Sequence, residues 1–183
     1  MSDLTITTAG QSESKVSGGE FLSSEKKLNQ MKVVLTEGVN PTCDTTPNYA
    51  AGDLFFNPIK VPNIVGVKGG SGIIQSVVAK SNDDLSAGFD IVISTSEGSI
   101  GTINDALSSE SPDDATIQRV QGVISINTMI PTSTSSFGFA SNCGVVIQAA
   151  EGTRDMYIWG IARGAIDIND ADGLFIRLGV IQD

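Results

Sequence analysis

The sequence contains no histidine, and this absence excludes several classes of function. Histidine is the usual general base near neutral pH, the usual partner of a serine or cysteine nucleophile, and the commonest zinc ligand. Most familiar hydrolase and metalloenzyme mechanisms are therefore excluded for this chain of 183 residues. We expect a protein that is not an enzyme and that needs no cofactor.

Basic residues are also scarce, because 11 Lys and Arg stand against 21 Asp and Glu, which gives a formal net charge of -10. Nucleic-acid binding depends on Lys and Arg that neutralise phosphates. We therefore expect no nucleic-acid partner, and an anionic membrane is disfavoured for the same reason. Long apolar runs are missing too, and the start at Met1 lacks the basic and apolar stretches of a signal peptide. The sequence predicts a soluble protein made in a cytoplasm.

Cysteine occurs twice, at Cys43 and Cys143, without a C-x-x-C spacing. This pattern favours two unpaired, partly buried thiols over a disulfide. A chain of this length buries about 70% of its unfolded surface, so it can form one domain without such a crosslink. Aromatic residues make up 5% of the chain, and we expect a mainly aliphatic core.

Residues 1–30 differ from the rest in being rich in Ser, Thr, Gly, Glu and Lys. The segment 12–19 has neither helical nor strand periodicity, which predicts a flexible N-terminal arm. Such a segment buries too little apolar surface to order alone, but it can order against a partner. The candidate partner-binding residues in it are Phe21, Leu22, Lys26 and Lys27. A merely disordered tail remains the alternative.

Residues 31–183 consist of short runs rich in Val and Ile, broken by Gly, Asn, Asp, Ser and Pro, which are strand and turn signals. The run from Tyr157 to Ala162 is apolar throughout and predicts a strand that is buried on both sides, inside the domain or at a subunit interface. One short helix is expected at 111–119, with Ser111 as its cap and Pro112 in its first position. The predicted strands are 32–37, 59–67, 73–81, 90–96, 122–127, 144–149, 156–162, 165–168 and 174–181. The fold class is therefore all-β: a β-sandwich or jelly-roll-like barrel with one short helix and an extended N-terminal arm.

Three motifs suggest chemistry, and each has a simpler explanation. The glycine-rich segment 68–72 is followed by a strand rather than a helix, so it predicts a hairpin turn and not a phosphate-binding loop. The acidic segment 167–173 lacks carboxylates at the first and last positions of an EF-hand, so a solvated turn is favoured over a calcium site. Ser and Lys occur three residues apart at 12–15, 23–26 and 24–27, but the flexible arm offers no desolvated site that would activate a lysine.

The second half of the chain carries DDATIQRVQGVI at 113–124, MYIWGIARG at 156–164 and ADGLFIRLG at 171–179. Together with AAGDL at 50–54 and GIIQSV at 72–77, these segments resemble head decoration (cement) proteins of tailed bacteriophages, over residues 31–183. The resemblance implies a β-sandwich or jelly roll that oligomerises, commonly as a trimer. It also implies a position on the outer capsid surface, across junctions between subunits of the major capsid protein, and no catalytic residues. On this view the protein is made in the host cytoplasm and stabilises the capsid lattice in the virion.

Two hypotheses follow for the partners. Residues 1–30 are expected to order on the capsid lattice or on a neighbouring subunit, and the strand at 157–162 is expected to form the trimer core. One alternative is a receptor- or glycan-binding module of a phage fibre, spike or tail. That module would present loops such as 132–142, in which Phe137 and Phe139 are the aromatic candidates, although the loop resembles a flexible segment with a tucked anchor. A carboxylate-dependent hydrolase with two close Asp or Glu is the remaining alternative.

Overall fold

The computed structural model describes residues 5–6, 14–15, 32–46, 48–112 and 114–182. The chain divides into two units, Met1–Met31 and Lys32–Asp183. In the first unit, strand β1 (Thr5–Ile6) pairs antiparallel with β2 (Ser14–Lys15). Strand β2 lies within the segment 12–19, for which the sequence predicted no strand. The candidate arm residues Phe21, Leu22, Lys26 and Lys27 lie outside the described residues.

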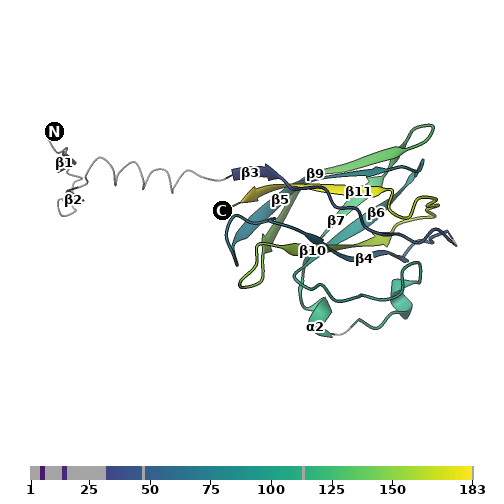
Figure 1. Cartoon of the computed structure of the whole chain (residues 1–183), viewed down its shortest axis with the longest axis horizontal. Coiled ribbons are helices and arrows are strands. Elements are labelled where there is room, and N and C mark those ends of the chain that lie inside the picture. Colours follow the sequence, from purple (N-terminus) through teal and green to yellow (C-terminus); the bar gives the residue numbers. More distant parts are fainter. Residues whose placement is uncertain (1–4, 7–13, 16–31, 47, 113, 183) are drawn as a thin grey trace. The chain divides into compact units, whose positions relative to one another are not determined.

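The second unit consists of two antiparallel sheets, with the strand order β4-β10-β6-β7 in the four-stranded sheet and β3-β11-β5-β9-β8 in the five-stranded sheet. Figure 1 shows their strands along one domain, with the short helix α2 beside the four-stranded sheet. The strands are β3 (Lys32–Leu35), β4 (Leu54–Val61), β5 (Ser71–Ser81), β6 (Ala87–Ser94), β7 (Val120–Thr128), β8 (Ile130–Pro131), β9 (Ser136–Gln148), β10 (Met156–Ala162) and β11 (Leu174–Gln182). The helical elements are the 3-10 turn η1 (Leu107–Ser109) and α2 (Asp114–Ile117). In the described part of the chain, no helix has the length and apolar character needed to cross a membrane.

The strand pairs are nested within one another along the chain. The innermost pair is β6 with β7, and around it lie β5 with β9, β4 with β10, and β3 with β11. Successive pairs fall in alternate sheets, as they do when one long hairpin is rolled up into a sandwich. This is the topology of a jelly roll, so the fold predicted from the sequence is confirmed.

The core lies between the two sheets and is built by alternation along their strands. In β5, for example, Ile74, Val77 and Ala79 are buried, whereas the alternating residues Val78 and Lys80 are exposed.

Four of the few aromatic rings gather at one place in this core. Tyr49 meets Phe55 edge-on at 5.0 Å between ring centroids. The Phe55 ring also lies 5.1 Å from Phe89 and 5.7 Å from Phe56. The core is otherwise aliphatic, as the composition predicted.

A side chain closes the sandwich where the two sheets meet at β7 and β9. The Gln121 side-chain amide on β7 donates to the Gln148 carbonyl at 2.7 Å and accepts from the Gln148 backbone N–H at 2.7 Å. Gln148 is the last residue of β9. One amide group therefore satisfies both backbone groups of this residue, as a further strand would.

Two predicted strands begin or extend differently in the structure. The strand predicted at 59–67 is β4, which starts earlier, at Leu54, and contains Pro58. Proline is tolerated there because β4 is an edge strand. The strand predicted at 144–149 is the end of the much longer β9, which begins at Ser136, so the predicted loop 132–142 is mostly strand. Sequence patterning missed this half because its inward positions are small residues such as Ser136 and Gly138.

Three further predictions are corrected by the connections. The segment 68–72 does not join a hairpin, because the strands on either side of it, β4 and β5, belong to different sheets. The strand predicted at 165–168 is reduced to a single bridge between Ile166 and Tyr49. The helix predicted at 111–119 is limited to the four residues of α2.

Candidate functional site

The outer faces of the two sheets differ. In the five-stranded sheet, the residues that alternate with the core positions point away from the domain, and the strand registers align them into cross-strand rows. We refer to this surface as the open face. Its members are Val33 and Leu35 of β3, Phe175, Arg177, Gly179 and Ile181 of β11, Ile73, Ser76, Val78 and Lys80 of β5, Phe137, Phe139, Ser141 and Val146 of β9, and Ile130 of β8.

Large apolar side chains on the open face are strongly exposed. Val33 is 77% exposed, Val146 is 67% exposed and Phe139 is 61% exposed. Val78 lies directly across from Phe139, and Ile73 lies across from Val146. Because the registers make these residues neighbours, they form apolar rows on one face, on either side of the row of Gly179, Ser76 and Ser141, rather than isolated apolar positions.

The charged groups of the open face are both basic. Lys80 lies across from Phe137, and Arg177 lies across from Val78. The Arg177 guanidinium carbon is 5.3 Å from the centroid of the Phe175 ring, a cation–π arrangement that orders it on the surface. Among the described residues, the ion pairs within 4.0 Å are Lys60 with Asp155 and Arg163 with Asp90, and neither lies on the open face.

The outer face of the four-stranded sheet, which we call the covered face, is largely buried by the chain itself over β4, β10 and β6, whereas Val123 on the edge strand β7 is 52% exposed. Trp159 of β10 points outward, yet it is only 4% exposed, because it packs with Leu54, Val92 and Ile100. Ile100 belongs to the long connection between β6 and β7, which also contains η1 and α2. This connection therefore forms a lid over the sheet, and Figure 1 shows it beside β4 and β10.

Hydrogen bonds fix the connection to the covered face. The Asn57 side-chain amide donates to the Gly101 carbonyl at 2.9 Å and accepts from the Ile100 backbone N–H at 2.9 Å. The Tyr157 hydroxyl donates to Glu97 at 2.6 Å, and this bond to a carboxylate raises the pKa of Tyr157 to about 12. The covering segment is thus bonded at several points to strands of the sheet that it covers.

Strand β10 is therefore buried within the domain. It lies between β4 and β6, its inward residues are in the core, and its outward Trp159 is under the connection. The prediction of a strand buried on both sides is confirmed, with the domain interior as the place of burial. Such a strand offers little side-chain surface to another subunit, so the structure does not favour it as a trimer core.

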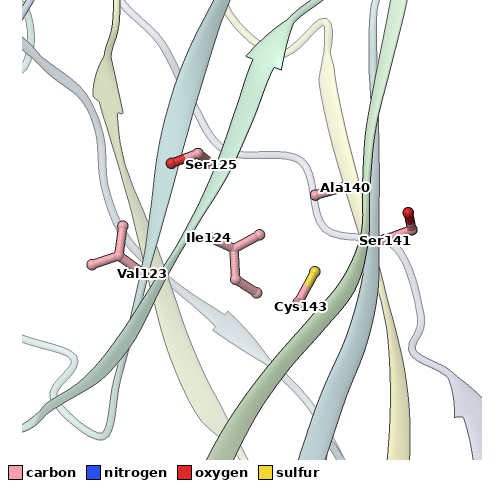
Figure 2. Close-up of a pocket in the computed structure, with 6 residues that line it drawn as sticks. All are labelled: Val123, Ile124, Ser125, Ala140, Ser141 and Cys143. Carbon is pink, nitrogen blue, oxygen red and sulfur yellow. The ribbon is translucent and has the colours of Figure 1, made fainter.

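A small cavity of about 200 Å³ lies between β7 and β9. Figure 2 shows the Ile124 and Cys143 side chains between the two strands, and Val123, Ser125, Ala140 and Ser141 complete the lining. Partial burial raises the pKa of the Cys143 thiol. The lining offers neither a general base nor a charged group, so the thiol stays protonated and is a poor nucleophile.

The other cysteine is a poor nucleophile as well. Cys43 is a buried free thiol, and burial, together with the nearby carboxylates of Asp172 and Asp83, raises its pKa to about 12. Cys143 is also free. Neither thiol resembles the low-pKa nucleophile of a cysteine-dependent enzyme.

The acidic turn at 167–173 uses its carboxylates for hydrogen bonds within the protein. Asp83 accepts from the backbone N–H groups of Asn169 at 3.2 Å and Asp170 at 3.3 Å. Asp170 accepts from the Asn82 amide at 2.8 Å, and Asp172 accepts from the Thr42 hydroxyl at 3.0 Å. Across the residues that the structure places, no cluster of three or more His, Cys, Asp or Glu is arranged to hold a metal ion.

The open face is absent from the predictions made from the sequence. Phe137 and Phe139 were predicted as aromatic candidates in a flexible loop with a tucked anchor, but both lie on strand β9 and are exposed. A strand signal was present here, because small residues alternate with aromatic residues in the run Ser136, Phe137, Gly138 and Phe139. The inference failed because it assigned the larger residues to the interior.

Comparisons with known proteins give only distant similarities. No family model matches the chain, and no curated protein matches it. Among solved structures, the chain is similar to one from a full particle of Israeli acute paralysis virus heated to 63 degrees, with a TM-score of 0.32, 8% identity, and coverage of 98% of this chain and 90% of that one.

Two further virus structures show similar values. One is the native virion of Kashmir bee virus at acidic pH, with a TM-score of 0.31, 8% identity, and coverage of 97% of this chain and 80% of that one. The other is deformed wing virus carrying the GFP gene, with a TM-score of 0.27, 11% identity, and coverage of 100% of this chain and 52% of that one. These TM-scores are below those of proteins that share a fold, so these structures assign no function to this chain.

Proposed function

We propose that this chain is a structural virion protein that binds the outer surface of a tailed-bacteriophage capsid and stabilises the lattice of the major capsid protein. In this role it is a decoration or cement protein that assembles with further copies of itself as a trimer. It is made in the host cytoplasm and has no catalytic activity. The resemblance of its C-terminal segments to head decoration proteins motivates this proposal.

The open face is the observation that supports it most. A monomeric soluble protein rarely exposes a contiguous apolar surface of more than a few hundred Å² unless that surface binds a partner. Here the exposed Val33, Val146 and Phe139 belong to one sheet face. Neither the cavity between β7 and β9 nor the two thiols provide a reactive group for catalysis. Binding therefore explains the described part of the molecule better than catalysis does.

Residues 1–30 are proposed as a second attachment to the capsid or to a neighbouring subunit. A tethered segment acts at high effective concentration once the domain is docked, so even a few contacts of Phe21, Leu22, Lys26 and Lys27 would slow dissociation. Deleting residues 1–30 should leave a soluble β-rich oligomer that binds expanded capsids poorly. Cosedimentation with capsids measures this, and undiminished binding of the deletion variant would contradict the role of the arm.

A receptor- or glycan-binding module of a fibre, spike or tail is the second candidate. The exposure of Phe139 favours it, since exposed aromatic rings are common in binding sites for sugars and proteins. The number of copies in purified particles distinguishes the two candidates. Hundreds of copies per particle support a decoration protein, and a handful support a fibre or spike.

A further inference from the structure

We propose that the open face is the surface that docks on the capsid, and that the capsid surface it meets is apolar and carries carboxylates opposite Lys80 and Arg177. This inference rests on the proposed function, and it assigns the contact to one side of the domain. It also specifies the chemistry of the partner, which the proposed function leaves open.

The distribution of exposed apolar side chains supports this assignment. Ten large hydrophobic residues are exposed in the described part of the chain, and seven of them lie on the open face. These seven are Val33, Leu35, Val78, Ile130, Phe137, Phe139 and Val146. Such a concentration on one face of one sheet indicates a surface that is covered when the protein functions.

The charges on the open face determine the chemistry of its partner. The protein as a whole is acidic, with a formal net charge of -10. On the open face, however, the strand residues that point outward include Lys80 and Arg177 and no Asp or Glu. Within the described residues neither cation has a carboxylate within ion-pair distance. A partner with carboxylates at these two points would be electrostatically complementary.

The size of the open face favours a lattice over a second copy of this chain. The five strands have four gaps of about 4.8 Å between them, and with a length of about 25 Å along the strands they give a patch of roughly 500 Å². A stable complex of two proteins buries about 800 Å² on each partner. A symmetric pair through the open face would also leave Lys80 and Arg177 without carboxylate partners, because the outward strand residues of that face include no Asp or Glu. A capsid contact can supply those carboxylates, and the proposed attachment of residues 1–30 adds to its small area.

A hollow at one end of the open face offers an anchor point. It has a volume of about 280 Å³ and is lined by Asn127, Thr128, Ile130, Gly138 and Phe139. Ile130 and Phe139 belong to the open face itself. Binding energy usually concentrates where one side chain fills such a site, so we expect an apolar side chain of the capsid protein to enter it.

The test uses the full chain and expanded capsids from which the native protein has been stripped. Cosedimentation gives the apparent Kd of four double variants. F139S/V146S removes exposed apolar groups of the open face, and V67S/V123S removes exposed apolar groups elsewhere. K80Q/R177Q removes the two cations, and K68Q/R119Q removes two exposed cations outside the open face. Far-ultraviolet circular dichroism and urea unfolding verify that each variant folds like the wild type.

We expect F139S/V146S to bind at least about 10-fold more weakly and K80Q/R177Q about 3- to 10-fold more weakly. Both control variants should stay within about twofold of the wild type. If the wild type itself does not bind capsids, the proposed function is wrong. If the wild type binds and the open-face variants bind equally well, the proposed function stands and this inference is wrong. Loss of oligomers with capsid binding intact would assign the open face to a second copy, and would also overturn the inference.

Discussion

The two sheets of this domain share one core, but their outer faces differ in how far they are exposed to solvent. On the four-stranded sheet, Trp159 is 4% exposed beneath the long connection between β6 and β7. On the five-stranded sheet, Phe139 is 61% exposed, and within the described part of the unit Lys32–Asp183 no segment lies over it. Both outer faces carry large apolar residues, so the difference lies in what covers them. The chain covers most of one face, with Val123 on β7 left exposed, and we propose that the capsid covers the other.

The largest expected contrast is in stability. Trp159→Ala should lower the free energy of unfolding by about 3–5 kcal/mol, because it leaves a cavity under the covering connection. Phe139→Ala should change it by less than about 0.5 kcal/mol, because the ring is mostly in solvent. Urea unfolding of the two variants measures both values. Equal losses would mean that the open face is already packed in the free protein.

The attachment of the covering connection gives a second, smaller contrast. Asn57→Ala removes the side-chain bonds to Ile100 and Gly101 and should cost about 1–2 kcal/mol. It should also loosen the lid over Trp159, the one tryptophan of the chain. Acrylamide quenching of tryptophan fluorescence should therefore increase. The matched control Asn127→Ala alters an asparagine at the end of β7, away from the connection, and should leave the quenching unchanged.

The ion pairs provide the smallest expected effect and a pH dependence. The Asn63 backbone N–H and the Lys60 ammonium group, 2.9 Å away, hold the pKa of Asp155 below its usual value of 3.8. A carboxyl group with a lowered pKa in the folded state stabilises the fold above its unfolded pKa, and this contribution is lost as the pH falls through the folded value. Asp155→Asn should cost about 1 kcal/mol at pH 7.

The same difference from the wild type should begin to shrink below about pH 4, where the unfolded state takes up the proton, and should be lost as the pH falls through the lower folded pKa of Asp155. Unfolding free energies of the two proteins between pH 7 and pH 3 give this comparison. Asp84→Asn, at an exposed position after β5, serves as the control. A difference that does not change with pH would show that the Asp155 charge contributes nothing.

Strand periodicity and turn chemistry were sufficient to predict the all-β class and many of the strands. The strand predicted at 156–162 has the bounds of β10, because its apolar run is uninterrupted. The edge strand β4 was displaced in the prediction, because Pro58 reads as a break unless the strand is known to lie at an edge. Local sequence does not contain that information, since the position of a strand in a sheet depends on distant pairings.

The open face was harder to predict for the same physical reason. Apolar residues on β5 occur at adjacent positions, on both faces of the strand. The sequence therefore does not show whether Ile73 or Ile74 points inward. The cover over Trp159 is equally hidden in the sequence, because it depends on Asn57 binding a segment more than forty residues away. Only the assembled sheets show that one outer face is covered and the other is not.

Hydroxyl-radical footprinting of the free and the capsid-bound protein tests the central claim most directly, because it reports the solvent exposure of individual apolar side chains. On capsid binding, we predict that labelling of Val33, Phe139 and Val146 falls severalfold, whereas labelling of Val123 and Ile117 on the other side of the domain stays the same. Protection of Val123 and Ile117, with Phe139 and Val146 still labelled, would place the contact on the covered side and contradict the account.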